Sequence, residues 1–271
     1  SRRGLPGGNV KKMSIAKAML FFNTIPLQDL RNALRARKGI YSHSVAARCP
    51  ALYTTRIICY IDAKGGGFMT AKQMERFTQH CDKCFRQKND RVLHSAAMND
   101  LHIDILLYEP TEEFPYWKMV TMGASDYKMP PAKGAIALRN EYIMLVDQGV
   151  DMHDKNAALW YCRKLWMIAR YAFENKINIT YGHSLEWQNE DDADEMVAAF
   201  IEFPQMFDYS ILHYKSGLFT DIACLLVVLL NKSELDQLMK IGPQQFSEYL
   251  FPEDENAPTH FLSERNRSER F

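Results

Sequence analysis

The segment Leu101–Pro131, LHIDILLYEPTEEFPYWKMVTMGASDYKMPP, is the stretch from which the rest of the chain is interpreted. Its first part, His102–Tyr108, is an apolar run, and Pro110 lies in the turn that follows. A second apolar run, Tyr116–Met122, ends in Thr-Met-Gly and leads into a polar Ser-Asp loop closed by two prolines. Two such runs on either side of a Pro-containing turn predict two neighbouring strands.

Outside this segment, strands and helices follow each other without the strict alternation of a parallel α/β fold. We therefore expect an α+β fold, with a mixed, mainly antiparallel sheet packed against helices and a small helical N-terminal extension. Apolar spacing and caps predict helices over Ser14–Phe22, Leu27–Lys38, Thr70–Arg86, Ala157–Phe173, Ser233–Lys240 and Pro243–Leu250. Apolar and β-branched runs predict further strands over Arg56–Ala63, Arg139–Asp147 and Met196–Phe203, a strand with a turn over Ile177–Trp187, and a pair of strands over Tyr209–Leu230.

Changes in composition divide the chain into three parts. Residues 1–45 form a basic extension, helical or partly disordered, in which the first 40 residues hold nine basic side chains and the single acid Asp29. Residues 46–252 are expected to form the α+β domain, and residues 253–271 a loose C-terminal tail. Residues 186–195, EWQNEDDADE, are strongly acidic.

The overall composition is that of a globular protein without a charge bias. The 33 basic residues balance 33 acidic ones, so net charge does not draw the whole chain to nucleic acid or to a membrane. Several of the six cysteines lie in apolar runs, which is typical of a reduced, cytoplasmic protein. No secretory signal is visible, and the longest apolar run, Ile222–Leu230, is half of the ~20 residues that a membrane helix needs.

Four separated blocks between Arg91 and Leu250 resemble the suppressor-of-fused domain family. The family pattern has a strand followed by Pro-Thr, a second strand ending in Thr-x-Gly-x-Ser-Asp, and a Met-Pro loop. A strand with a glutamate, a helix with Ala-Arg and a Gly-His turn follow. Ala124, the short Lys133–Ala137 loop and the N-terminal 70 residues depart from that pattern. The matching positions are His102, Asp104, Pro110, Thr111, Thr121, Gly123, Ser125, Asp126, Met129, Pro130, Glu141, Leu145, Trp160, Leu165, Ala169, Arg170, Gly182 and His183.

The resemblance implies a protein-binding domain that is not an enzyme and needs no cofactor or metal. The animal member of the family sequesters a transcription factor by β-strand addition, and bacterial members are regarded as immunity proteins that neutralise toxins. The short chain looks more like the bacterial kind, so we expect capture of a protein partner, such as a basic toxin steered by Glu190–Glu195. The candidate partner-binding residues are Thr121, Gly123, Ser125, Asp126, Gly182, His183 and Trp187.

A first alternative is a serine hydrolase that uses Ser125 with His183 or His102. A nucleophile elbow requires Gly-x-Ser-x-Gly, and Tyr127 occupies the position of the second glycine. The pattern favours instead a structural or partner-binding turn, with Asp126 in an Asx-turn and Ser125 bonded to the local backbone.

A second alternative is a zinc-stabilised nucleic-acid adaptor built from the basic N-terminal helices and the His80-Cys81…Cys84 group. A structural zinc site needs four ligands, and Cys49 and Cys59 do not form a second pair of suitable spacing. The three glycines at 65–67 lack the spacing of a phosphate-binding loop, so a flexible turn is favoured.

Two histidines leave a structural and a functional interpretation open. His183 either fixes its turn by bonding a carbonyl or contacts a partner. His102 and Asp104 lie on one face of a strand, where they form either a buried hydrogen-bonded pair, which is favoured, or an exposed contact.

Overall fold

The computed structural model describes residues 13–14, 22–26, 69–95, 101–189, 194–216, 221–254, 259–265 and 267. Its helices are α2 (Ala71–Cys84), α3 (Lys155–Asn175), α4 (Lys232–Ile241) and α5 (Pro243–Leu250), with 3₁₀ turns η1 (Ala124–Asp126) and η2 (Tyr209–Ile211). Its strands are β1 (Met13–Ser14), β2 (Phe22–Pro26), β3 (Arg91–Ser95), β4 (Asp104–Tyr108), β5 (Tyr116–Met122), β6 (Asn140–Asp147), β7 (Ser184–Gln188), β8 (Ala198–Glu202), β9 (His213–Lys215) and β10 (Asp221–Leu230).

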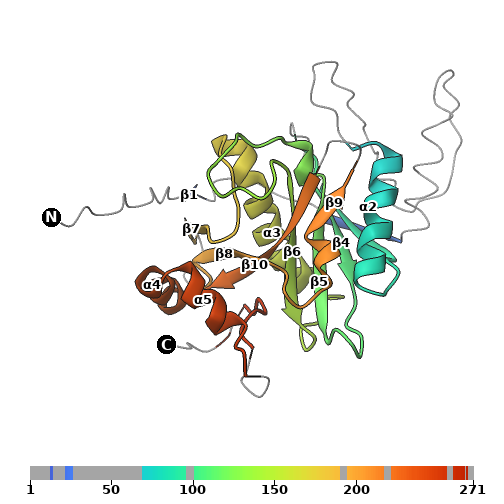
Figure 1. Cartoon of the computed structure of the whole chain (residues 1–271). Helices are drawn as coiled ribbons and strands as arrows, with labels where there is room; N and C mark the ends of the chain where they lie inside the picture. The colour runs from blue at the N-terminus through green and yellow to red at the C-terminus, as the bar shows by residue number, and fades with distance from the viewer. Residues whose placement is uncertain are drawn as a thin grey trace, which may run out of the picture.

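One ten-stranded sheet runs through the molecule in the order β1-β7-β8-β10-β6-β5-β4-β3-β2, and β9 pairs with β10 (Figure 1). The β1–β7 and β10–β6 pairs are parallel, and the other described pairs are antiparallel. The parallel β6–β10 pair lies at the centre, and α3 follows β6 in the chain. A mixed, mainly antiparallel sheet with helices confirms the α+β class predicted from the sequence.

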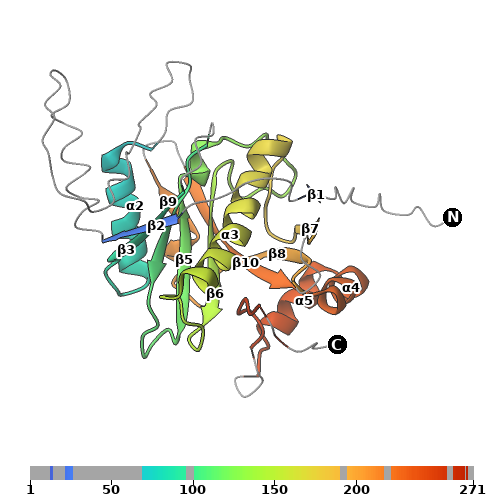
Figure 2. The same cartoon turned by 180° about the vertical axis from the view of Figure 1, so that it is seen from behind.

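Helices cover both faces of this sheet. Figure 2 shows α3 in front of the strands, whereas α2, α4 and α5 lie on the opposite side. In β4, Ile105 and Leu107 join the core under α3, while Leu106 and Tyr108 join the core under α2 and α5. Because alternate residues of a strand point to opposite faces, a sheet covered on both faces needs apolar residues at every position. This explains why the strand sequences are continuous apolar runs.

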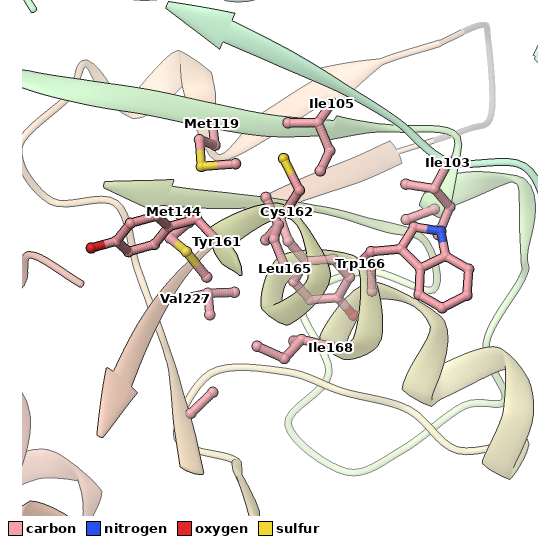
Figure 3. Close-up of a cluster of buried hydrophobic side chains, with 14 of the residues drawn as sticks. Ile103, Ile105, Met119, Met144, Tyr161, Cys162, Leu165, Trp166, Ile168 and Val227 are labelled. Atoms are coloured by element: carbon pink, nitrogen blue, oxygen red, sulfur yellow. The ribbon is translucent and has the colours of Figure 1, made fainter. Parts of the chain in front are cut away.

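The long helix α3 provides the centre of one of these two cores. Asp154 caps its N-terminus by accepting a hydrogen bond from the backbone N–H of Ala157 at 2.8 Å. Cys162 and Leu165 are completely buried and point toward the sheet (Figure 3). Ile105, Met119, Met144 and Val227 meet them from four strands. Truncating a side chain as buried as that of Leu165 costs about 2–5 kcal/mol in comparable cores.

The opposite core begins at α2. Thr70 forms a capping box with Gln73, in which each side chain bonds the backbone N–H of the other residue. Phe77 and Cys81 are fully buried on the inner face of the helix, at the spacing seen in the sequence. The predicted helix over Thr70–Arg86 is therefore confirmed, within two residues at its end.

The N-terminal extension differs from the prediction where the structure describes it. Both ends of the expected helix Ser14–Phe22 are strand residues, in β1 and β2, and residues 15–21 lie outside the described part. The predicted helix Leu27–Lys38 and strand Arg56–Ala63, together with the glycines at 65–67, also lie outside it.

One other prediction requires correction. No strand was expected over Arg91–Ser95, which is β3. The strand with a turn expected over Ile177–Trp187 corresponds to the turn at residues 181–182 and to β7, which begins at Ser184. The RVLHS sequence of β3 has a single β-branched residue, Val92, and no alternation of apolar and polar residues, which are the features by which strands are recognised.

The described part of the C-terminal tail is packed, although a loose tail was expected. Phe261 and Ser263 are buried, and the backbone N–H of Ser263 donates to the carbonyl of Leu145 at 2.8 Å. Arg267 forms a buried ion pair with Glu234 on α4. The domain boundaries themselves remain a prediction. Within the described ranges, no helix has both the length and the apolar character required to cross a membrane.

Candidate functional site

The loop after β5, here called the signature loop (Thr121–Tyr127), is organised around the buried carboxylate of Glu141. Oε1 accepts hydrogen bonds from the backbone N–H groups of Gly123 at 2.9 Å and Ser125 at 3.0 Å, and from the Ser125 hydroxyl at 2.6 Å. Oε2 accepts from the Thr121 hydroxyl at 2.6 Å and the Ala124 N–H at 3.2 Å. Successive N–H groups at the start of a 3₁₀ turn favour an anion.

Gly123 allows the backbone to make this turn. Its φ angle is +119°, and an added Cβ would lie 2.2 Å from the carbonyl oxygen of His102. Only glycine adopts this conformation readily, and only glycine leaves room for the neighbouring backbone. The signature loop is thus held against the segment that leads into β4.

Burial controls the ionisation of Glu141. Complete burial raises the pKa of Glu141 to about 7, and the hydrogen bonds from Ser125, Thr121 and the backbone act in the opposite direction. The carboxylate is enclosed by the protein, so its role is to shape the loop.

The outer side of the loop is tied to two other elements. Arg139 donates to the carbonyl oxygens of Ser125 at 2.5 Å and Asp126 at 2.8 Å. The Asp126 carboxylate accepts the backbone N–H of Met69 at 2.9 Å, which connects the loop to the start of α2. Burial raises the pKa of Asp126 to about 6. The expected Asx-turn is therefore wrong, because this side chain bonds a residue distant in sequence.

Ser125 is placed as a structural residue. It is 2% exposed, and its hydroxyl donates to Glu141, not to the local backbone as expected. A serine nucleophile must reach its substrate and transfer its proton to a base, and this side chain is enclosed by the protein. No observation on Ser125 favours the hydrolase alternative.

The second predicted region, Gly182–Trp187, forms the turn into β7. Gly182 has a φ angle of +80°, and its N–H donates to the carbonyl of Ile201 at 2.9 Å. The exposed His183 ring accepts a hydrogen bond from the backbone N–H of Thr180 at 3.4 Å. This bond fixes the turn, but its partner is a backbone N–H group and not the carbonyl that was expected. Trp187 is 4% exposed, and its indole N–H donates to the carbonyl of Met196 at 2.9 Å.

Two asparagines connect this turn to the segment that follows the signature loop. Asn140 donates to the carbonyl of Ile179 at 2.6 Å, and Asn178 donates to the carbonyl of Pro130 at 3.1 Å. These bonds join the segment before the turn to Pro130 and to the start of β6, whereas three strands separate β7 from β5 in the sheet. Of the candidate residues, Thr121, Gly123, Ser125 and Trp187 are buried, Asp126 and Gly182 are half-buried, and His183 is exposed.

Part of the acidic segment is neutralised within the chain. Asp194 lies 2.7 Å from the ammonium group of Lys164, which also sits over the rings of Trp160 and Trp187, 5.4 Å and 4.9 Å from their centroids. Residues 190–193 lie outside the described part of the chain, so steering by Glu190–Glu195 stays a prediction except at Asp194, whose charge is paired.

His102 and Asp104 form the close pair expected from the sequence, and His94 joins them. Asp104 is 3% exposed; its carboxylate lies 2.8 Å from Nε2 of His102 and 3.1 Å from Nδ1 of His94. Burial opposes ionisation of Asp104, but the contacts with His102 and His94 hold its pKa below the usual range. Sequence reasoning missed His94 because it lies on β3, which was not predicted.

The cysteines of the zinc alternative belong to the core. Cys81 is fully buried and Cys84 is 6% exposed on the inner face of α2, and burial raises the pKa of both thiols. His80 lies 3.8 Å from the Cys84 sulfur. Across the described residues, the side chains that could together hold a metal ion are His94, His102 and Asp104, not these cysteines.

Comparisons with known proteins agree with this architecture. The family described as Suppressor of fused protein (SUFU) matches residues 99–262. Drosophila Suppressor of Fused is 13% identical with a TM-score of 0.54, and the match covers 78% of this chain and 53% of that one. A comparison with curated proteins finds no match.

Two further solved structures are similar over nearly their whole length. The Sufu–Fu complex structure contains a chain 12% identical, with a TM-score of 0.54 over 73% of this chain and 91% of that one. A putative SUFU homolog from Neisseria gonorrhoeae FA 1090 is 10% identical, with a TM-score of 0.52 over 73% and 96%. At these identities the likeness establishes the fold alone.

Proposed function

Because the chain belongs to the suppressor of fused family, we propose that it is a non-enzymatic domain that captures and occludes a protein partner. The family match confirms the resemblance noted in the sequence. One structural relative was crystallised in a Sufu–Fu complex, which supports protein binding as the activity of this fold. The finer proposal is that of a bacterial, cytoplasmic immunity protein that neutralises a toxin.

The observation that carries the proposal is the outer side of β7, which within the described residues is paired with another strand, β1, only at Trp187 and Gln188. Antiparallel pairing to β8 uses alternate residues of β7: the His183 carbonyl accepts from Ile201 N–H at 2.9 Å, and the Trp187 N–H donates to the Val197 carbonyl at 3.0 Å. By this alternation the backbone groups of Ser184 and Glu186 point away from β8.

The outer side of β7 is only partly covered. The register of β1 pairs Met13 with Trp187 and Ser14 with Gln188, and no described strand pairs with Ser184, Leu185 or Glu186 on that side. Unpaired backbone groups on an edge strand bind extended peptides by strand addition. His183 lies at the start of this edge, where its exposed ring would contact the incoming strand.

The charge near this edge favours a basic partner. Glu186 is half-buried on β7, and Glu195 is exposed just before β8. Acidic side chains around a strand-binding edge increase the association rate with a positively charged partner, mainly at low ionic strength. A basic toxin domain has this chemistry.

Two substitutions at one position separate backbone pairing from charge. Glu186→Pro removes the outward N–H and the carboxylate, whereas Glu186→Ala removes the carboxylate alone. We expect Glu186→Pro to weaken partner binding at least about tenfold, and Glu186→Ala about threefold or less at physiological salt. Leu185→Pro, which removes a donor facing β8, serves as the unfolding control. Equal binding by the Pro and Ala variants would exclude strand addition at this edge.

The immunity role is tested with a toxin-like protein encoded beside this chain. The toxin is expressed in cells with and without the chain, and survival and co-purification are measured. Protection that is lost with Glu186→Pro, at an unchanged expression level, supports both the role and the site. Survival that does not depend on the chain would refute the immunity role but would leave open binding to another protein.

A further inference from the structure

Three metal-binding side chains meet where β3 ends and β4 begins. The antiparallel register pairs Val92 with Leu106 and Leu93 with Ile105, so the next pair along the ladder is His94 with Asp104. His102 lies two residues before Asp104 and therefore on the same face of the chain. The backbone thus fixes the position of all three residues, which lie at the side of the sheet that faces α2.

The distances among the three groups fit a shared cation. Each histidine faces a different carboxylate oxygen of Asp104, with Nε2 of His102 at 2.8 Å from Oδ1 and Nδ1 of His94 at 3.1 Å from Oδ2. One ligand atom from each of the three residues lies within 4.8 Å of the others. Zinc–nitrogen and zinc–oxygen bonds of about 2.0–2.2 Å hold tetrahedral ligands about 3.3–3.5 Å apart. Binding would require the three ligand atoms to move from their present separations to that spacing.

Hydrogen bonding leaves part of this cluster unsatisfied. Nε2 of His94, on the side of the ring away from Asp104, is buried without a hydrogen bond within the described residues, whereas Oδ1 of Asp104 lies 2.8 Å from His102. Buried polar atoms in folded proteins almost always have a partner. The ring of His94 therefore offers a buried nitrogen that is not used in a hydrogen bond within the described residues.

The site is also accessible from solvent. The His102 side chain is 39% exposed, whereas those of His94 and Asp104 are 19% and 5% exposed. An ion can therefore enter beside His102 and meet the anchored carboxylate behind it. We propose that His94, His102 and Asp104 bind one divalent transition-metal ion, with Zn²⁺ as the ion that this ligand set fits best.

The position of the site indicates which part of the fold a bound ion would stabilise. It connects β3 to β4, and the carbonyl of His102 lies against Gly123 of the signature loop. Occupancy would therefore stabilise the corner from which that loop departs. Three protein ligands leave a fourth position for water or for a side chain of a bound protein. The site does not depend on the partner-binding edge proposed on β7.

The test uses the full chain, treated with a chelator and then titrated with zinc chloride alone. We expect one equivalent of Zn²⁺ to bind and the Tm to rise by about 5 °C once free zinc reaches about one hundred times Kd. Mg²⁺, which prefers oxygen ligands and keeps its water, is expected to produce no shift.

Variants then locate the bound ion. His94→Gln and His102→Gln are expected to abolish the stoichiometric binding and the Tm shift, whereas His213→Gln, on the distant strand β9, keeps both. Binding that survives in the first two variants, or that is lost with His213→Gln, overturns the site. Circular dichroism shows whether each variant folds. If a variant does not fold, the unmodified chain decides: no Zn²⁺ shift, or an equal shift with Mg²⁺, overturns the proposal.

Discussion

A Cβ atom on Gly123 would lie 2.2 Å from the carbonyl oxygen of His102, closer than any side-chain carbon lies to a backbone oxygen in a relaxed structure. The turn also holds Gly123 at a φ angle of +119°. We expect Gly123→Ala to lower the free energy of unfolding by about 3 kcal/mol or more, because it adds a clash with fixed backbone to an unfavourable φ angle. Urea denaturation measures this loss.

Gly134 offers a matched control for that substitution. Its φ angle is +80°, and an added Cβ would meet nothing within 4 Å. Gly134→Ala carries only the conformational cost of a positive φ angle, so we expect the free energy of unfolding to fall by about 1 kcal/mol. Equal losses at the two positions would show that the contact with His102 is not what requires glycine at 123.

Glu141→Gln tests the centre of the signature loop. The amide keeps one acceptor oxygen for Gly123 and Ser125, but its NH₂ group faces the N–H of Ala124. A buried donor without an acceptor costs about 1–3 kcal/mol, and we expect a loss of that size in the free energy of unfolding at pH 5.

The raised pKa of Glu141 predicts how the difference in stability between the natural protein and Glu141→Gln changes with pH. Since the pKa of Glu141 is raised from 4.5 to about 7, the folded state binds its proton more tightly than the unfolded state. This contribution to stability is fully present below pH 4.5 and is lost as the pH rises through 7. The advantage of the natural protein over Glu141→Gln should therefore shrink between pH 5 and pH 8. An advantage that grows over this range would show that the loop prefers the carboxylate.

Local signals in the sequence were sufficient to predict much of this architecture. Thr70 with Gln73 marks the start of α2, and the apolar run Tyr116–Met122 is β5 with the same bounds. These features depend on residues close together in the chain, where periodicity and capping act directly. The family resemblance located the signature loop, but not the reason for its pattern.

What the sequence did not reveal depends on contacts between distant residues. The residues of the Thr-x-Gly-x-Ser pattern surround the carboxylate of Glu141, which lies 16 positions after Ser125. Nothing local in RVLHS shows that His94 faces Asp104, because that contact requires the pairing of β3 with β4. The burial of Arg267 likewise depends on a carboxylate of α4, 33 positions earlier. For this reason, composition alone led to the prediction of a loose tail over residues 253–271.

Removal of the Arg267 guanidinium should reveal the cost of an isolated buried charge. Arg267 and Glu234 are 5% and 1% exposed, and Arg267 also donates to the carbonyl of Leu229 at 2.6 Å. We expect Arg267→Met to lower the free energy of unfolding by about 3–5 kcal/mol, because Glu234 loses its cation. The Arg267→Met, Glu234→Gln pair should recover part of that loss. Strict additivity of the two losses in thermal unfolding would argue against direct coupling.

Lys118 is a buried cation in a different setting, and here substitution should be tolerated. It is 0% exposed, and its ammonium group donates to the carbonyls of Glu109 at 2.6 Å and Tyr116 at 3.3 Å. Burial lowers the pKa of Lys118 from 10.5 to about 8. Because hydrophobic side chains of similar volume often replace buried charges without loss, we expect Lys118→Met to change the free energy of unfolding by less than about 1 kcal/mol at pH 7.

The pH dependence of Lys118→Met provides the sharper test of how this lysine is buried. Between pH 8 and 10.5 the unfolded chain binds more protons at Lys118 than the folded chain, so the natural protein gains stability as the pH rises, and loses it as the pH falls through 8. The free energies of unfolding of the natural protein and of Lys118→Met are compared by urea denaturation. Their difference should increasingly favour the natural protein as the pH rises over this range. Lys72→Met, at an exposed position of α2, should show no such shift. A flat difference for Lys118→Met would mean that its ammonium remains hydrated in the folded protein.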